Sequence, residues 1–225
     1  MRGDAVGVNV LSVRFLAGMT PELCAALGLR SAYRSVGLIS TDSDDATYIA
    51  LDEATKRANV EVSYARSLYA GAKNASTPLA GEVIGILGGE SPAEVRSGMA
   101  GALELLHGGV SFRTADDAGG VIYLAHCVAR TGSYLSGLAG VAQGEALAYL
   151  IAPPVEAICG LDAALKAASV RLAHFFAPPS ETNFGGGLLT GTQSACRAAC
   201  DAFAAAVCAA AQNPLETGGY DGLRP

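Results

Sequence analysis

The stretch LDEATKRANV occupies residues 51–60, and a close copy, LDAALKAASV, occupies residues 161–170. The likeness extends on both sides of this stretch. Residues 10–29 line up with residues 122–141 at an offset of 112, and the segment around Val95 lines up with that around Cys196 at an offset of 101. An internal repeat of this size sets the fold before any single motif does. The chain therefore contains two similar domains.

The offset between the repeats falls from 110 to 101 between Val60 and Val95, so a length change lies there. We place it in residues 69–80 and in their counterpart, residues 180–187, because loops absorb insertions. The predicted domains are residues 1–112 and 113–215, followed by a flexible tail at residues 216–225.

The composition indicates a compact protein with large subunit contacts. The 225 residues are 51% hydrophobic and only 16% charged, enough for two cores of about 100 residues each. The mean hydropathy is +0.33, yet no apolar run reaches the roughly 18 residues of a membrane span. The first residues, MRGDAVGVN, do not read as a signal peptide. We expect a cytoplasmic protein with apolar interfaces.

Charge and cysteine spacing exclude several functions. The net charge is −6 and the 15 basic residues are dispersed, which argues against nucleic-acid binding. The six cysteines form no C-x-x-C pair, and the three histidines have no metal-ligand spacing. Cys196 and Cys200 align with Val95 and Met99, so we interpret them as core residues. No metal site and no catalytic group is predicted.

Both repeats predict the same elements. In the first repeat we expect strands near residues 8–17, 36–40, 60–64 and 82–87, and helices beginning at Thr20-Pro21, near residue 46 and at Ser91-Pro92. We interpret Gly88-Gly89 as a turn and residues 185–187 as a flexible loop. Without a strict βαβ rhythm, the pattern favours an α+β fold, with an antiparallel or mixed sheet and flanking helices.

Ser43-Asp44-Asp45 precedes a predicted helix in the first repeat, whereas the second repeat has Pro153-Pro154-Val155 at that place. Acidic residues suit a helix N-terminus for dipole reasons alone, so a simple cap is one interpretation. A carboxylate pair in one copy only is also compatible with a cation site between the two domains.

The pattern D-x-x-x-K-x-A-x-V, followed by a strand, a loop, a strand ending in glycine and a helix, resembles the bacterial microcompartment shell domain. Longer runs are similar to the tandem-domain shell proteins of ethanolamine utilisation, and they cover nearly the whole chain. These runs include residues 37–40, 42–48, 65–72, 91–96, 130–136, 152–154 and 178–184.

The resemblance implies two tandem, circularly permuted shell domains and a homotrimer that forms a pseudohexamer. Such a structural tile packs with other microcompartment shell proteins and is not an enzyme. The resemblance places Lys56 and Lys166 at the tile edge; the alternative is that both are ordinary lysines of a last helical turn.

The resemblance also implies a gated central pore. We expect the gate in residues 69–77 and 178–187, with Tyr69, Asn74, Thr182, Asn183 and Phe184 as gate residues and the last two as the plug. No cofactor is required, although cobalamin or another bulky cofactor is expected to pass the open pore.

A small pore in each subunit is expected to bind ethanolamine. An ammonium alcohol needs a carboxylate and further hydrogen-bond acceptors. We expect Asp44, Asp45 and Glu82 to supply these, and the resemblance implies that the backbone near Phe112 closes the site. The alternative function is a soluble trimeric sensor that binds a small molecule between its two domains.

Overall fold

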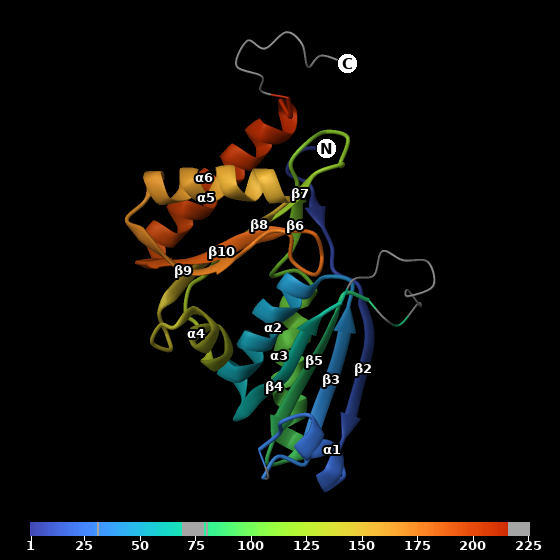
Figure 1. Cartoon of the computed structure of the whole chain (residues 1–225). Coiled ribbons are helices and arrows are strands. Elements are labelled where there is room, and N and C mark those ends of the chain that lie inside the picture. Colours follow the sequence, from blue (N-terminus) through green and yellow to red (C-terminus); the bar gives the residue numbers. More distant parts are fainter. Residues whose placement is uncertain (31, 69–78, 80, 216–225) are drawn as a thin grey trace.

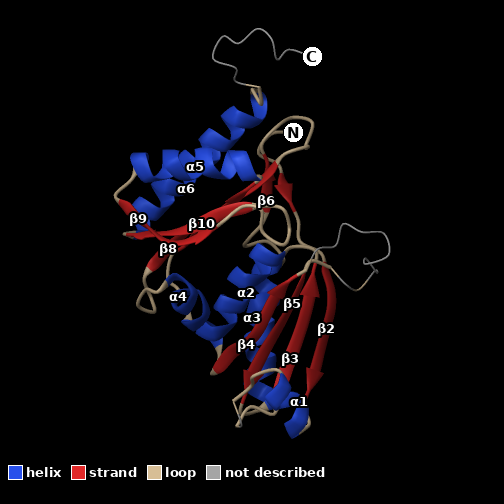
Figure 2. Cartoon of the chain, in the orientation of Figure 1, coloured by secondary structure: helices blue, strands red, loops and turns tan. Residues whose placement is uncertain are grey.

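The structure, a computed structural model, describes residues 1–30, 32–68, 79 and 81–215. It contains two β-sheets, and helices from each half of the chain cover the sheet of that half (Figure 1, Figure 2). The architecture is α+β, as the sequence predicts.

In the first half the sheet order is β2-β3-β5-β4, and every neighbouring pair is antiparallel. Helix α3 begins where its sequence dictates, because the Ser91 hydroxyl accepts a hydrogen bond from the Glu94 N–H at 3.2 Å and Pro92 takes the first helical position. The elements are β2 (Val10–Leu16), α1 (Pro21–Ala26), β3 (Ser35–Thr41), α2 (Asp44–Arg57), β4 (Val60–Ser67), β5 (Val83–Gly89) and α3 (Pro92–Leu106).

The second half repeats this series. Four of its strands have the order β7-β8-β10-β9, which is the order of the first sheet. The internal repeat is therefore confirmed element by element. The elements are β7 (Ile122–Val128), α4 (Ser133–Ala139), β8 (Ala146–Ala152), α5 (Pro154–Ala167), β9 (Val170–Phe176), β10 (Gly185–Gly191) and α6 (Gln193–Gln212).

Two short strands extend the second sheet. β1 (Ala5–Val6) pairs antiparallel with β6 (Phe112–Thr114), and β6 pairs with β7. The beginning of the chain thus lies on the sheet of the second half. This crossing brings Phe112 close to the start of α2, where the predicted ligand residues lie.

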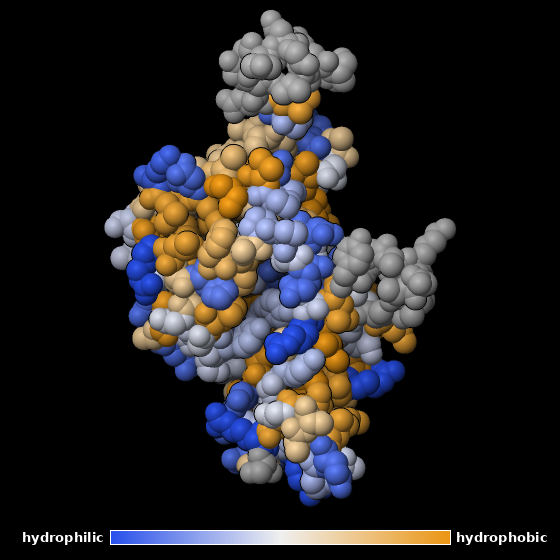
Figure 3. Space-filling model, viewed as in Figure 1, coloured by the Kyte–Doolittle hydropathy of each residue, from blue (hydrophilic) through white to orange (hydrophobic). Residues whose placement is uncertain are grey.

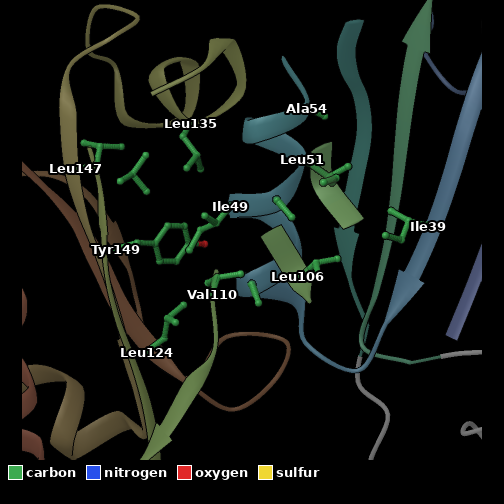
Figure 4. Close-up of a cluster of buried hydrophobic side chains, with 14 of the residues drawn as sticks. Ile39, Ile49, Leu51, Ala54, Leu106, Val110, Leu124, Leu135, Leu147 and Tyr149 are labelled. Carbon is green, nitrogen blue, oxygen red and sulfur yellow. The ribbon is translucent and has the colours of Figure 1, made fainter. Parts of the chain in front are cut away.

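Helix α2 lies between the two halves and is buried on several sides. Ala46, Ile49, Ala50, Leu51 and Ala54 are at most 2% exposed. Figure 4 shows side chains of α2 in a cluster with residues of β8 and α4 on one side and of β3 and α3 on the other. One hydrophobic cluster therefore spans both halves.

The predictions for the two glycine segments are wrong. Gly88 and Gly89 are not a turn but the end of β5, paired with β3. Residues 185–187 are not a loop but the start of β10, and a Cβ on Gly186 would lie 1.9 Å from the Leu150 carbonyl oxygen. Gly186 and Gly187 permit a close approach of neighbouring backbone, which is a known use of glycine inside strands, whereas Gly88 and Gly89 leave room for the side chains of Ser63 and Val95.

Helix α6 is the helix in the described part of the chain that is long and apolar enough to cross a membrane. Its apolar stripe is instead a core surface, because Cys196, Cys200, Phe203 and Val207 are buried in the second hydrophobic cluster. The two cysteines are free thiols in that core, as predicted.

Candidate functional site

Two carboxylates begin helix α2 at the junction of the two halves. Asp44 and Asp45 are its first residues and are 6% and 7% exposed. The Asp44 carboxylate accepts the Asp45 N–H at 2.8 Å, and the helix dipole favours negative charge at this end. Ser43, the preceding residue, makes no side-chain cap, and its Oγ is buried without a hydrogen-bond partner among the described residues.

A cavity of about 120 Å³ adjoins these residues. Among the residues predicted for the ligand site, Asp44, Glu82 and Phe112 line it. Ser43 and the predicted gate residue Phe184 line it as well. The remaining described lining residues are Val6, Gly7, Val8, Asp42 and Ile122.

The cavity is acidic. Burial, followed by the charges of Asp44 and Asp42, raises the pKa of Glu82 to about 7. Burial also raises the pKa of Asp44, and a hydrogen bond from Ser67 opposes that change. The described lining residues include no lysine or arginine. Asp42 accepts hydrogen bonds from the backbone N–H and the side chain of the neutral Asn9. Asp44 and Glu82 are the other two carboxylates of the cavity, and none of the three forms an ion pair among the described residues.

Asp45 does not line this cavity. Its carboxylate accepts a hydrogen bond from the Tyr149 hydroxyl at 2.8 Å, across the junction between the halves. Burial, followed by the charge of Asp44, holds the pKa of Asp45 well above its usual range. Asp45 instead lines a second cavity of about 230 Å³, which Asp44 also lines. The structure therefore separates the two adjacent aspartates, and Asp44 is the one next to Glu82 and Phe112.

Of the predicted gate residues, Phe184 lines this cavity, and Thr182 contacts Asp44, which also lines it. The Thr182 hydroxyl lies 3.5 Å from an Asp44 carboxylate oxygen, and the Phe184 ring packs against Phe112 with centroids 5.7 Å apart. Asn183 is exposed and left-handed, with a φ of 65°, and its N–H donates to Ser180 O in a tight turn. The turn at residues 180–184, part of the predicted gate, thus lies against this cavity. Tyr69 and Asn74 lie outside the described residues.

The two predicted edge lysines have different surroundings. Lys56 is 26% exposed, pairs with Glu53 at 2.6 Å, and donates to the Arg130 carbonyl oxygen at 3.1 Å. It lines a groove of about 740 Å³ together with Arg130. Lys166 is 75% exposed and pairs with Asp162 at 2.5 Å.

Sequence reasoning missed Tyr149 and assigned Ser43 only to a helix start. The repeat points to Tyr149 once the strands are known, because the bounds of β3 and β8 pair Leu38 with Tyr149, and Asp45 aligns with Val155. Both polar residues of this hydrogen-bonded pair replace apolar ones in the other copy. Paired departures from a repeat point to contact between the two positions.

Comparison with known proteins agrees with this architecture. Residues 35–114 match the family model of the BMC domain. The chain is 60% identical to the bacterial microcompartment shell protein EutL of Clostridium perfringens, over 96% of this chain and 99% of that protein. It is 52% identical to EutL of Escherichia coli, over 95% and 97%.

A crystal structure of the ethanolamine utilization protein EutL from Leptotrichia buccalis superimposes with a TM-score of 0.93 at 58% identity, covering 96% of this chain and 99% of that one. These relatives are structural shell proteins, not enzymes, and they match both halves of this chain in one continuous alignment. The chain therefore belongs to the EutL group of bacterial microcompartment shell proteins.

Proposed function

We propose that the chain forms a homotrimeric tile in the shell of an ethanolamine-utilising microcompartment, with six similar domains around a central pore. The repeat supports this, since two domains of equal topology in each of three chains supply six comparable positions. Head-to-tail contacts between such units close into a ring when the rotation fits. The tile then meets other shell proteins along its edges, where Lys56 and Lys166 are the proposed edge residues.

The small cavity at the junction is the proposed binding site for ethanolamine. The observation that carries this proposal is a pair of carboxylates, Asp44 and Glu82, that face one cavity with no cation among its described lining residues. An ammonium group between them would relieve the repulsion that contributes to the raised pKa of Glu82. The buried Ser43 hydroxyl, which lacks a partner among the described residues, is suited to hydrogen-bond the ligand hydroxyl.

Binding at this site is proposed to bias the gate. Thr182 and Phe184 contact Asp44 and Phe112, so a ligand in the cavity adjoins the loop at residues 180–184. The ligand shifts the gate only to the extent that it binds one loop conformation more tightly than the other. We propose that the occupied site favours the closed state, in which Asn183 and Phe184 obstruct the pore.

The test is calorimetric titration of the full chain with ethanolamine at pH 8. Glu82→Gln and Asp44→Asn should each weaken binding at least about tenfold, because each removes one charge partner of the ammonium group. Glu90→Gln, which changes an exposed carboxylate directly after β5, is the matched control and should bind as the wild type does. Absence of binding by the wild type would exclude ethanolamine as the ligand, and normal binding by both site variants would exclude the cavity.

A further inference from the structure

The junction between the two halves contains a buried carboxylate that binds backbone. Asp52, in α2 of the first half, accepts the N–H of Gly132 at 2.7 Å and that of Leu135 at 2.8 Å, both in the second half. Asp52 and the Leu135 side chain are both 0% exposed. The aspartate of the D-x-x-x-K pattern thus joins the two halves within one chain.

The repeat places the same groups on two free surfaces. Asp162 is the counterpart of Asp52, but its side chain is 61% exposed and its hydrogen-bond partner among the described residues is Lys166. Leu23 is the counterpart of Leu135 and is 46% exposed. The acceptor lies on α5 and the leucine on α1. Figure 1 shows these two helices at opposite ends of the molecule, so they cannot meet within one chain.

A second pair of contacting residues differs between the two repeats, and both members of the pair differ together. Within the chain, the Thr55 hydroxyl accepts the Ser133 N–H at 3.0 Å. The counterparts of these two residues are Leu165 and Pro21. Leucine has no acceptor and proline has no N–H, so the hydrogen bond is lost from both sides together and leaves no group unpaired. This matched loss is expected when the two positions face each other.

We propose that the α5–β9 face of one chain seats the α1 face of a second copy, with Asp162 accepting the backbone N–H of Leu23 across the interface. The face around Asp162 carries large apolar side chains suited to such burial: Ile158, Leu165, Leu172 and Phe175 are 38–47% exposed. Figure 3 shows apolar surface over the region of α5 and α6. The contact is head-to-tail and repeats the junction already present inside the chain.

The interchain contact differs from its internal model in one respect. Thr20 stands where the chain junction has Gly132, and a Cβ on Gly132 would lie 2.5 Å from the Asp52 carbonyl oxygen and 2.2 Å from the Thr55 hydroxyl. A leucine at position 165 is no smaller than a threonine, so the Thr20 side chain requires the two backbones to lie further apart than in the internal junction. In the proposed contact the Asp162 side chain turns away from Lys166 and spans that separation.

This inference rests on the proposed trimer and names a carboxylate that holds it together. The first experiment measures trimer dissociation of the full chain by native mass spectrometry and sedimentation over a range of concentrations. Asp162→Ala should raise the dissociation constant of the trimer at least about tenfold, since it removes a charged hydrogen-bond acceptor. Asp201→Ala, an exposed carboxylate on α6, is the matched control and should remain wild-type. Circular dichroism should show an unchanged fold for both variants.

The second experiment tests the facing pair with a double-mutant cycle. The cycle is measured in a Thr20→Gly background, which restores the glycine of the internal junction. Leu165→Thr and Pro21→Ser should each weaken the trimer, and the double variant should be about fivefold more stable against dissociation than additivity predicts, because it rebuilds the Thr55–Ser133 hydrogen bond between chains. The inference would be overturned if the Asp162→Ala trimer were as stable as the wild-type trimer, or if the effects of Leu165→Thr and Pro21→Ser were additive. Either result would still be consistent with the proposed trimer. A monomeric wild type would instead remove the proposed assembly itself.

Discussion

Replacing Asp52 with alanine should destabilise the chain more than any exposed carboxylate does. The substitution leaves two backbone N–H groups, those of Gly132 and Leu135, without the acceptor that they have at 2.7 and 2.8 Å. Because Asp52 is 0% exposed, water does not reach the site to replace it. The loss therefore falls on the contact between α2 and α4, where the two halves meet.

The magnitude follows from the groups left unpaired. Each buried donor without a partner costs about 1–3 kcal/mol. Burial raises the pKa of the Asp52 carboxyl, so its removal also relieves part of a desolvation cost. We take the lower half of the range and expect a loss of about 3 kcal/mol, which lowers the Tm of a chain of this size by about 6–12 °C.

The assay is thermal unfolding followed by circular dichroism at a fixed protein concentration, with midpoints compared directly because a two-domain oligomer need not unfold in two states. Asp52→Asn, which keeps one acceptor oxygen, should fall between the wild type and the alanine variant. Asp201→Ala serves as the control for loss of an exposed charge. A midpoint for Asp52→Ala within about 2 °C of the wild type would refute the assigned role of this carboxylate.

Three further outcomes are expected. Gly186→Ala should lower stability by at least about 1–3 kcal/mol in thermal melts, because its Cβ would lie 1.9 Å from the Leu150 carbonyl oxygen; an unchanged melt would show that β10 yields easily. Tyr149→Phe removes the hydroxyl that lowers the pKa of Asp45, so carbon NMR titration should show that pKa rising further, and a fall would contradict the assignment. Ethanolamine should bind more tightly as the pH rises from about 6 to 8, since Glu82, with a pKa of about 7, must ionise to pair with the ammonium group. Calorimetry should show proton release on binding in that range, and Glu82→Gln should abolish both effects.

The repeat made most of the fold predictable. Each element inferred in the first copy had a counterpart in the second. The hydrophobic periodicity and the capping residues of the second copy therefore supported each prediction independently. The starts of α1 and α3, at Pro21 and Pro92, follow from proline at a first helical position. The glycine segments failed because glycine in a turn and glycine under a close neighbouring strand look alike in sequence.

The candidate site was predictable in composition but not in orientation. The sequence places Asp44 and Asp45 side by side, yet neighbouring residues of a helix point about 100° apart. Which of them faces Glu82 depends on how α2 packs between two sheets, and that packing involves Tyr149 from the other half. Contacts between residues about 100 positions apart leave no local pattern, so only the comparison of the two repeats carried a trace of them.

The acidic pair occurs in one repeat because the two copies of this helix face different neighbours. Asp45 accepts a hydrogen bond from the Tyr149 hydroxyl of its own chain, and Asp44 accepts one from the Thr182 hydroxyl. Neither carboxylate is therefore buried without a hydrogen-bond donor. The counterpart of Asp45 on α5 is Val155, which is 69% exposed and belongs to the surface proposed to meet a second copy. In the proposed interchain contact the counterpart of Tyr149 is Leu38, which has no hydroxyl to donate to an aspartate at position 155. The number of proposed ligand sites therefore follows the type of junction and not the number of domains: we expect three sites in the proposed trimer, one at each junction within a chain.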